Sequence, residues 1–140
     1  MAGYSGTPLP QKLGIKSGHQ VLLANAPKGF KTTLGKLPTE VMLHKPGDRD
    51  GPFDVIVLFA NNLAELRWEF APLKELLVSN GGLWVAWPKK ASGVETDLTE
   101  DLIREMGLKA GLVDNKVCAI DEVWSGLRLV IRVKDRPKTR

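Results

Sequence analysis

Unbroken runs of apolar residues alternate along this chain with polar stretches that are rich in glycine and proline. The clearest run spans 53–60 and is β-branched, aromatic and apolar after Asp54. A strand that is covered on both faces, as in a parallel sheet, carries such a run because both of its sides meet a core. We therefore predict six strands, at 19–24, 40–44, 53–60, 83–87, 112–120 and 127–133.

Two longer segments carry apolar residues at every third or fourth position, which is the spacing of one face of a helix. They begin at Asn62 and Asp97, and glutamate follows each three positions later, which is the pattern of a capping box. We expect Pro72 to kink or split the first helix and the Asn-Gly-Gly sequence at 80–82 to end it. The two apolar faces consist of Leu63, Leu66, Phe70, Leu73 and Leu77, and of Leu102, Ile103, Met106 and Ala110.

A short helix is predicted at 7–13, and a short helix or a turn at 29–37. Strands that alternate with helices are typical of an α/β fold with a mostly parallel sheet. The six-residue link at 121–126 suits an antiparallel hairpin between the last two strands. We predict a single α/β domain over residues 1–133, with a mostly parallel, six-stranded sheet that ends in an antiparallel C-terminal hairpin.

The positive charge of the chain is concentrated at its C-terminal end. The 140 residues carry a formal net charge of +4, and the tail at 134–140 holds four basic residues and one acidic residue. The remainder is therefore nearly neutral, which makes nucleic-acid binding an unlikely main function. The tail contains a proline and no large apolar residue, so we expect it to be a disordered, solvated end. A phosphate-grasping arm is the alternative interpretation of the tail.

Composition predicts a cytoplasmic protein. The hydrophobic fraction is 43%, yet no apolar run approaches the roughly 20 residues that cross a bilayer. The N-terminus shows neither the basic start nor the apolar stretch of a secretory signal. The single cysteine, Cys118, cannot form an internal disulfide, which fits a reducing compartment.

Parts of the chain resemble class I S-adenosylmethionine-dependent methyltransferases, from the lead-in to their first motif to their fourth and fifth strands. A closer resemblance, over nearly the whole chain, is to a family of small bacterial proteins of unknown function, through GLWVAWPKKASG at 82–93 and GLVDNKVCAIDE at 111–122. These resemblances imply a reduced Rossmann-like, methyltransferase-like sheet with local strand order 2-1-3-4-6-5 and a cytoplasmic habit, but no activity. The stretches that carry the first resemblance are 13–22, 53–57, 73–77 and 81–85.

The positions that bind S-adenosylmethionine in that family hold different residues here. The acidic residue at the end of the first strand falls on Leu23, and two glycines fall on Asn25 and Pro27. The carboxylate that would hold the ribose hydroxyls falls near His44 and Lys45, and the third strand and its helix are missing. Each ribose hydroxyl of the ligand that is left without a hydrogen-bond partner would lower the binding free energy by about 1–3 kcal/mol. We therefore expect no ordinary S-adenosylmethionine binding and assign no cofactor.

Other catalytic and metal-binding patterns do not fit. The segment 29–37 resembles a phosphate-binding P-loop, but it has five residues between its glycines and Leu37 where a hydroxyl belongs. His19 and His44 stand alone, without a second ligand at metal spacing. Cys118 lies in an apolar strand and is expected to be a small core residue. We assign no catalytic residue and no metal ligand.

The best candidate site follows from topology. In open α/β sheets, ligands bind beyond the carboxyl ends of the strands, where the strand order reverses. Three such ends carry amides, lysines and a serine that suit an anionic or carbonyl-bearing ligand. An alternative interpretation is that these residues only form turns, helix caps and solvated loops. The candidate ligand-binding residues are Asn25, Lys28, Asn61, Lys89, Lys90 and Ser92.

Three functions remain open from the sequence. The first is a non-catalytic binding or regulatory module for a small anionic ligand or a protein partner. Trp68, which lies off the apolar stripe of its helix, would suit a protein contact. The second is a divergent small-molecule group transferase that uses Asn25, Lys28, Lys89 and Ser92. The third is a nucleic-acid accessory protein that uses the basic tail.

Overall fold

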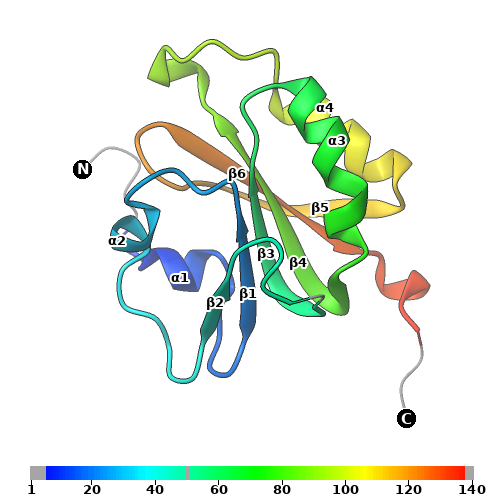
Figure 1. Ribbon diagram of the computed structural model, residues 1–140. Coiled ribbons are helices and arrows are strands. Elements are labelled where there is room, and N and C mark those ends of the chain that lie inside the picture. Colours follow the sequence, from blue (N-terminus) through cyan, green and yellow to red (C-terminus); the bar gives the residue numbers. More distant parts are fainter. Residues whose placement is uncertain (1–5, 50, 138–140) are drawn as a thin grey trace.

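The computed structural model describes residues 6–49 and 51–137, and its centre is a six-stranded sheet in the order β2-β1-β3-β4-β6-β5 (Figure 1). The strands β2, β1, β3 and β4 pair in parallel, and β6 is antiparallel to both β4 and β5. The predicted α/β fold and strand order are confirmed. The strands are β1 (Gln20–Ala24), β2 (Met42–His44), β3 (Phe53–Phe59), β4 (Leu77–Pro88), β5 (Leu112–Ala119) and β6 (Trp124–Ile131). The helices are α1 (Leu9–Lys12), α2 (Phe30–Leu34), α3 (Leu63–Lys74) and α4 (Glu100–Lys109), with short 3-10 helices η1 (Lys90–Ser92) and η2 (Val133–Asp135).

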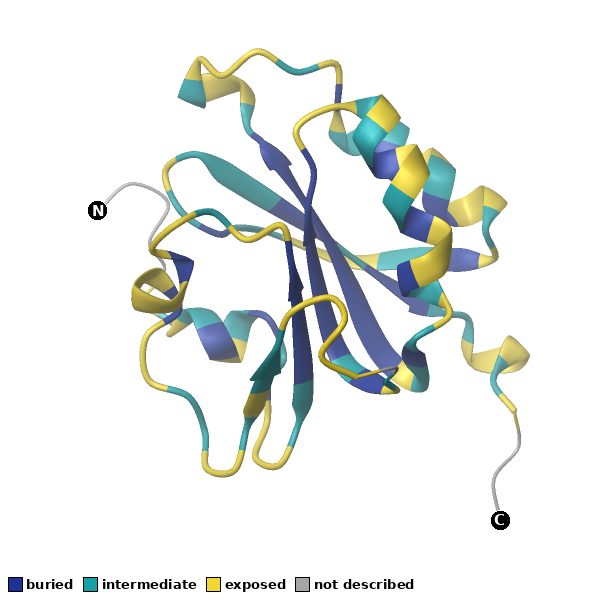
Figure 2. Ribbon diagram, in the orientation of Figure 1, coloured by how far each residue is buried: buried dark blue, intermediate teal, exposed yellow. Residues whose placement is uncertain are grey.

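Helices cover the two faces of the sheet and create two cores. Helices α3 and α4 contribute Leu66 and Ile103 to the core on one face, whereas Leu13 and Phe30, from the end of α1 and from α2, belong to the core on the other. Successive side chains of a strand point to opposite faces, so the central strands supply residues to both cores. Figure 2 shows these strands as the buried centre of the molecule. This double burial explains the unbroken apolar runs in the sequence.

Trp84 in β4 joins the sheet to the end of α1. Its side chain is fully buried, and its indole Nε1 donates a hydrogen bond to the Leu13 carbonyl oxygen at 3.0 Å. Gly126 of β6 leaves the room that the indole needs, because a Cβ at this position would lie 3.0 Å from Trp84 Cε3. The centre of this face is therefore a large aromatic ring held by one polar contact.

The boundary between α3 and β4 differs from the prediction. The helix ends at Lys74, and β4 begins at Leu77 rather than at residue 83, so the Asn-Gly-Gly sequence lies within a strand. Gly81 is required there because a Cβ would come within 2.6 Å of the Asp54 carbonyl oxygen in β3. The glycine therefore serves the close approach of two strands, and it does not end the helix as expected.

Pro72 does not split α3 as predicted. The helix continues past it to Lys74. A proline lacks the N–H that would bond to the carbonyl four residues earlier, which belongs to Trp68. Because the Trp68 side chain is 84% exposed, that carbonyl lies on the outer face of the helix, where water can replace the lost hydrogen bond.

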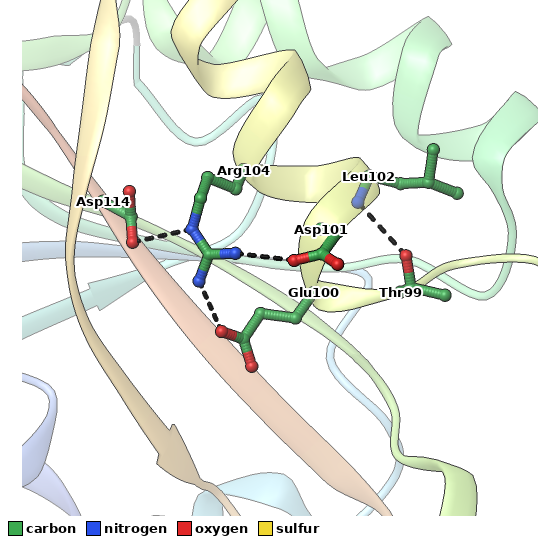
Figure 3. A network of polar contacts seen from close by, with 6 residues as sticks. All are labelled: Thr99, Glu100, Asp101, Leu102, Arg104 and Asp114. Carbon is green, nitrogen blue, oxygen red and sulfur yellow. Dashed lines mark hydrogen bonds and ion pairs between the residues drawn. The ribbon is translucent and has the colours of Figure 1, made fainter.

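The start of α4 also differs from the prediction. Thr99, not Asp97, caps this helix, and its Oγ1 accepts a hydrogen bond from the Leu102 N–H at 3.1 Å (Figure 3). Asp97 Oδ1 instead accepts from the Leu63 N–H at 2.8 Å, at the first residue of α3. Asn62 caps α3 as predicted, since its Oδ1 accepts from the Glu65 N–H at 2.8 Å, but Glu65 reaches back to the N–H of Asn61 and not to that of Asn62. The loop before α4 thus helps to cap two helices.

Arg104 fastens α4 to the sheet through a network of carboxylates (Figure 3). Its Nε donates to Asp114 of β5 at 3.0 Å, and its terminal nitrogens pair with Glu100 and, at 2.8 Å, with Asp101. Hydrogen bonds to Asp114 and then to Glu100 are the largest causes that raise the pKa of Arg104 above its ordinary value. Arg104 and Asp114 are partly exposed and Asp101 is almost fully exposed, so solvent weakens these ion pairs and the network serves mainly to orient the helix.

The two outer strands of the sheet are short or irregular. β2 has three residues, and Met42 is exposed there. β5 has eight residues, but its pairing with β6 shifts between Asp114 and Lys116, so that Asn115 stands out of the regular ladder. Neither edge therefore presents a long, regular row of free backbone groups among the described residues.

The chain ends lie partly outside the described residues. Of the tail that was predicted to be disordered, residues 134–137 are described and include the end of η2, whereas 138–140 are not described. The disorder of the tail stays a prediction. Among the described residues, no helix combines the length and apolar character that a membrane span requires.

Candidate functional site

The structure divides the predicted rim between two separate hollows. Asn25 lines a cleft of about 540 Å³ between the carboxyl ends of β1 and β2. Lys89 and Lys90 line a second hollow of about 560 Å³ between the end of β4 and the start of α4. The other candidates, Lys28, Asn61 and Ser92, line neither of these two hollows. The six residues therefore do not form one common site in this structure.

The cleft between β1 and β2, hereafter the β1–β2 cleft, has an apolar floor and a basic rim. Leu23 and Leu43, at the ends of the two strands, contribute to its floor together with the buried Phe30 of α2. Lys31 and Lys45 belong to its lining and are both exposed. This combination suits a ligand with an apolar body and an anionic group.

Asn25 adopts a conformation that glycine normally supplies. Its φ is +60°, in the left-handed region, which asparagine tolerates better than most residues. Its Nδ2 donates to the two carboxylate oxygens of Glu69 in α3 at 2.7 and 2.8 Å. The turn after β1 therefore keeps the backbone form of a glycine turn, while the amide side chain of Asn25 is held by α3.

The end of β2 is held by local hydrogen bonds. His44 Nε2 lies 2.6 Å from Gln20 Oε1, which also accepts from Arg49 at 3.0 Å. The Lys45 N–H donates to Asp48 Oδ2 at 3.0 Å. The imidazole and the carboxylate that line the β1–β2 cleft thus help to shape it. Asp48 forms no ion pair with a described residue, so its negative charge lies in the cleft together with the two ammonium groups.

Two residues of the predicted rim have local partners near the second hollow. Ser92 Oγ donates to the Lys89 carbonyl oxygen at 2.7 Å and accepts from the Val94 N–H at 3.1 Å, which closes the turn at η1. Asn61 donates to Glu65 Oε1 at the start of α3, through its backbone N–H at 3.0 Å and through its side-chain Nδ2 at 3.4 Å. Both side chains match the alternative interpretation of the sequence, in which they form turns and helix caps.

Sequence reasoning missed the contribution of β2 to the cleft. Lys31, Lys45 and Asp48 were not among the candidates, because only the ends of three other strands were considered. A parallel pair of adjacent strands brings both carboxyl ends to one edge of the sheet, and β2 pairs with β1 in this way. That rule applied to the strand at 40–44 would have pointed to the residues that follow it.

Metal chemistry finds no support in the geometry. Within residues 6–49 and 51–137, the histidine, cysteine, aspartate and glutamate side chains form no cluster of three or more that could hold a metal ion. Cys118 is half-buried in β5, and burial raises the pKa of its thiol, although Lys12 and Lys116 partly oppose this shift. A thiol of this kind is a poor nucleophile at neutral pH.

Comparisons with known proteins define the fold of this chain but not its activity. No protein-family model matches the sequence, and no curated protein is similar to it at a significant level. Solved structures do match. A SAM-dependent methyltransferase from Aquifex aeolicus is 14% identical, with a TM-score of 0.59, over 92% of this chain and 91% of that one.

Two further structures show how widely the fold is used. DhpI, solved in complex with SAH, is 11% identical with a TM-score of 0.60 over 95% of this chain and 83% of its own. A precorrin 8W decarboxylase from Methanobacterium thermoautotrophicum is 13% identical with a TM-score of 0.54 over 87% and 86%. The chain therefore has a Rossmann-like, methyltransferase-like fold, whereas identities this low do not transfer an activity.

Proposed function

We propose that this protein is a non-catalytic binding or regulatory module that holds a small anionic ligand in the β1–β2 cleft. The single observation that carries the proposal is the pairing of Lys31 and Lys45 with an apolar floor at the carboxyl ends of adjacent parallel strands. Ligands bind at this edge in open α/β sheets. The two ammonium groups favour a ligand with a phosphate group, since ammonium is a common partner of phosphate.

The chemistry of the cleft favours binding over catalysis. His44 is hydrogen-bonded to Gln20, and Asp48 accepts from a backbone N–H, so both titratable groups have structural partners. A general acid or base must reach the reacting group of a substrate with a free proton or lone pair. Asn25, the one predicted site residue in this cleft, has its amide nitrogen committed to Glu69.

A divergent group transferase is the second candidate, and the methyltransferase-like fold is the observation that favours it. DhpI, which shares this fold, was solved with SAH. The two candidates predict different ligands. A binding module with a lysine rim prefers phosphate-bearing compounds, whereas a transferase related to the methyltransferases requires an S-adenosyl compound.

Thermal unfolding with a ligand panel tests the proposal. The panel contains S-adenosylmethionine, S-adenosylhomocysteine, NAD, ATP, coenzyme A and inorganic phosphate. A ligand at a hundred times its dissociation constant adds about 2.7 kcal/mol, which raises the midpoint of unfolding by several degrees. We expect a shift with phosphate-bearing compounds that Lys45→Gln reduces. Lys90→Gln, which removes the same charge from the second hollow, serves as the matched control and should leave the shift unchanged.

The outcomes separate the hypotheses. A shift with the S-adenosyl compounds alone would overturn the anion-binding proposal in favour of the transferase. If no compound of the panel shifts the midpoint, ligand binding in the β1–β2 cleft would be contradicted. The exposed Trp68 on α3 would then be the first surface to study for binding of a protein partner. Equal effects of Lys45→Gln and Lys90→Gln would place any binding outside the cleft.

A further inference from the structure

Arg128 occupies an unusual position in the middle of β6. Its Cα pairs with Trp84 of β4 on one side and with Lys116 of β5 on the other. Its guanidinium lies directly over Gly82 of β4, where a Cβ would come within 2.3 Å of Arg128 Nε and 2.7 Å of Cζ. With glycine at this position the guanidinium rests directly on the backbone of β4, whereas a side chain at residue 82 would have to displace it.

The guanidinium of Arg128 has no acceptor in the described part of the chain. Its Nε is buried and unbonded. Burial, and then the positive charge of Arg136, lower the pKa of Arg128 from its ordinary value. An arginine nevertheless stays charged in a protein at neutral pH, because the guanidinium is not deprotonated there. A half-buried charge without a partner is costly to the fold and is rare unless something outside the fold compensates it.

Two further cations lie near Arg128, since Lys116 is its partner in the β5–β6 ladder and Arg136 is close enough to lower its pKa. Lys116 is exposed, and its Nζ donates to the Lys12 carbonyl oxygen at 2.9 Å, which leaves two of its three donors free. Arg136 donates through Nε to the Ile131 carbonyl oxygen at 3.0 Å, which holds its guanidinium beside the end of β6. All ion pairs among residues 6–49 and 51–137 belong to Arg104, so no described carboxylate neutralises these charges.

Arg128 is only partly buried, in contrast to Trp84 and Ile120, which are buried at this end of the core beneath α1 and α2. Figure 1 shows α1 and α2 together beside β1 and β2, whereas η2 follows β6 on the opposite side of β4. Because Arg128 as a whole is only partly buried while its Nε is buried, the outer part of its side chain reaches solvent.

We propose that Lys116, Arg128 and Arg136, here called the β6 cation patch, form a second anion site that takes a phosphate group. The terminal nitrogens of Arg128 offer parallel donors that match two oxygens of a phosphate, and this bidentate geometry is the strongest that arginine makes. Lys116 is the partner of Arg128 in the β5–β6 ladder, and Arg136 is close enough to lower the pKa of Arg128, so both add positive charge nearby. A bound phosphate would provide the negative counter-charge for Arg128, which no described carboxylate provides.

This inference does not depend on the β1–β2 cleft. The β6 cation patch lies on strands β5 and β6 and after η2, whereas the cleft lies at the ends of β1 and β2. Experiments can therefore show anion binding at one of these sites and not at the other. The experiment must report each site by its own signals.

A site-resolved titration with pyrophosphate tests the patch. The 140-residue chain suits nitrogen–proton NMR. At constant ionic strength, we expect saturable shifts of the Arg128 Nε–H signal and of the Gly82 backbone amide. Inorganic phosphate should act in the same way with lower affinity, and chloride should not act at all. Shifts confined to the amides around Lys45 would overturn the second site while supporting the cleft.

Substitutions make the test quantitative. Arg128→Met keeps an unbranched chain over Gly82 and should abolish the saturable shift of the Gly82 amide. Lys116→Gln changes an exposed position and Arg136→Gln a partly buried one. Each should weaken pyrophosphate binding by about tenfold, because each removes a charged donor. Arg67→Gln, on the exposed side of α3, removes one positive charge elsewhere and serves as the matched control. Equal affinity in Arg136→Gln, Lys116→Gln and wild type would refute the proposal.

Discussion

Replacing Trp84 by phenylalanine tests whether one buried hydrogen bond holds α1 onto the sheet. The indole is fully buried, and Nε1 donates to the Leu13 carbonyl oxygen at 3.0 Å. Leu13 is itself fully buried at the end of α1. Phenylalanine keeps an aromatic ring at the centre of this face, but it cannot donate, and it fills less space.

The magnitude of the effect follows from two losses. A buried carbonyl that loses its donor costs about 1–3 kcal/mol. The hole left by the smaller ring adds about 1 kcal/mol, as for a cavity the size of a methyl group. Together these losses lower the free energy of unfolding by about 2–4 kcal/mol, which corresponds to a fall of roughly 10 °C in the midpoint for a domain of this size.

Urea unfolding followed by circular dichroism measures this change. Trp68→Phe is the matched control, because the same substitution at a side chain that is 84% exposed should change stability by no more than about 0.5 kcal/mol. Amide hydrogen exchange in α1 gives a second readout, and we expect faster exchange there in Trp84→Phe. Equal midpoints for Trp84→Phe and Trp68→Phe would refute the reasoning.

Two further substitutions test other local features. Burial raises the pKa of Cys118, so the folded state disfavours its thiolate, and stability should fall as the pH rises above the ordinary thiol value of about 8.5 towards the folded value. Urea unfolding between pH 7.5 and 9.5 measures this loss, which Cys118→Ala should abolish; an unchanged slope would contradict the assignment. Asn25→Ala should be less stable than Asn25→Gly by about 1 kcal/mol, since both lose the bond to Glu69 but only alanine is strained at a φ of +60°. Urea midpoints decide this, and alanine equal to glycine would show that the turn relaxes.

The fold could be predicted from the sequence because burial on both faces leaves a clear pattern. The run at 53–60 became β3, which is buried on both faces and pairs with β1 and β4. Such a run depends only on which layers meet the strand, so local residue types carry the information. The resemblance to the methyltransferases then gave the strand order.

Glycine and capping residues misled the prediction because their local chemistry has more than one use. Gly81 was interpreted as a helix end, but it permits a close approach to the Asp54 carbonyl oxygen on a neighbouring strand. Asp97 was interpreted as the cap of α4, but its carboxylate accepts from Leu63 at the start of α3. The partner is distant in sequence in both cases, so no local pattern could reveal it.

The candidate site was predictable only to the level of the sheet edge. Topology places ligands beyond the carboxyl ends of the strands, and Asn25 does line a cleft there. Its engagement by Glu69 depends on where α3 packs, which the sequence does not specify. The absence of a partner for Arg128 is likewise a property of side chains brought together by three strands. Ligand binding by the six candidates stays a prediction.

The irregular outer strands bear on how the molecule behaves in a crowded solution. A long, flat strand edge is a template on which a second chain adds as a further strand, the first step of amyloid-like assembly. β2 is too short for such a template, and the shift at Asn115 interrupts the ladder along β5. The two ends of the sheet therefore oppose fibril growth by their shape, and a deletion that restored a regular ladder at Asn115 would remove this protection.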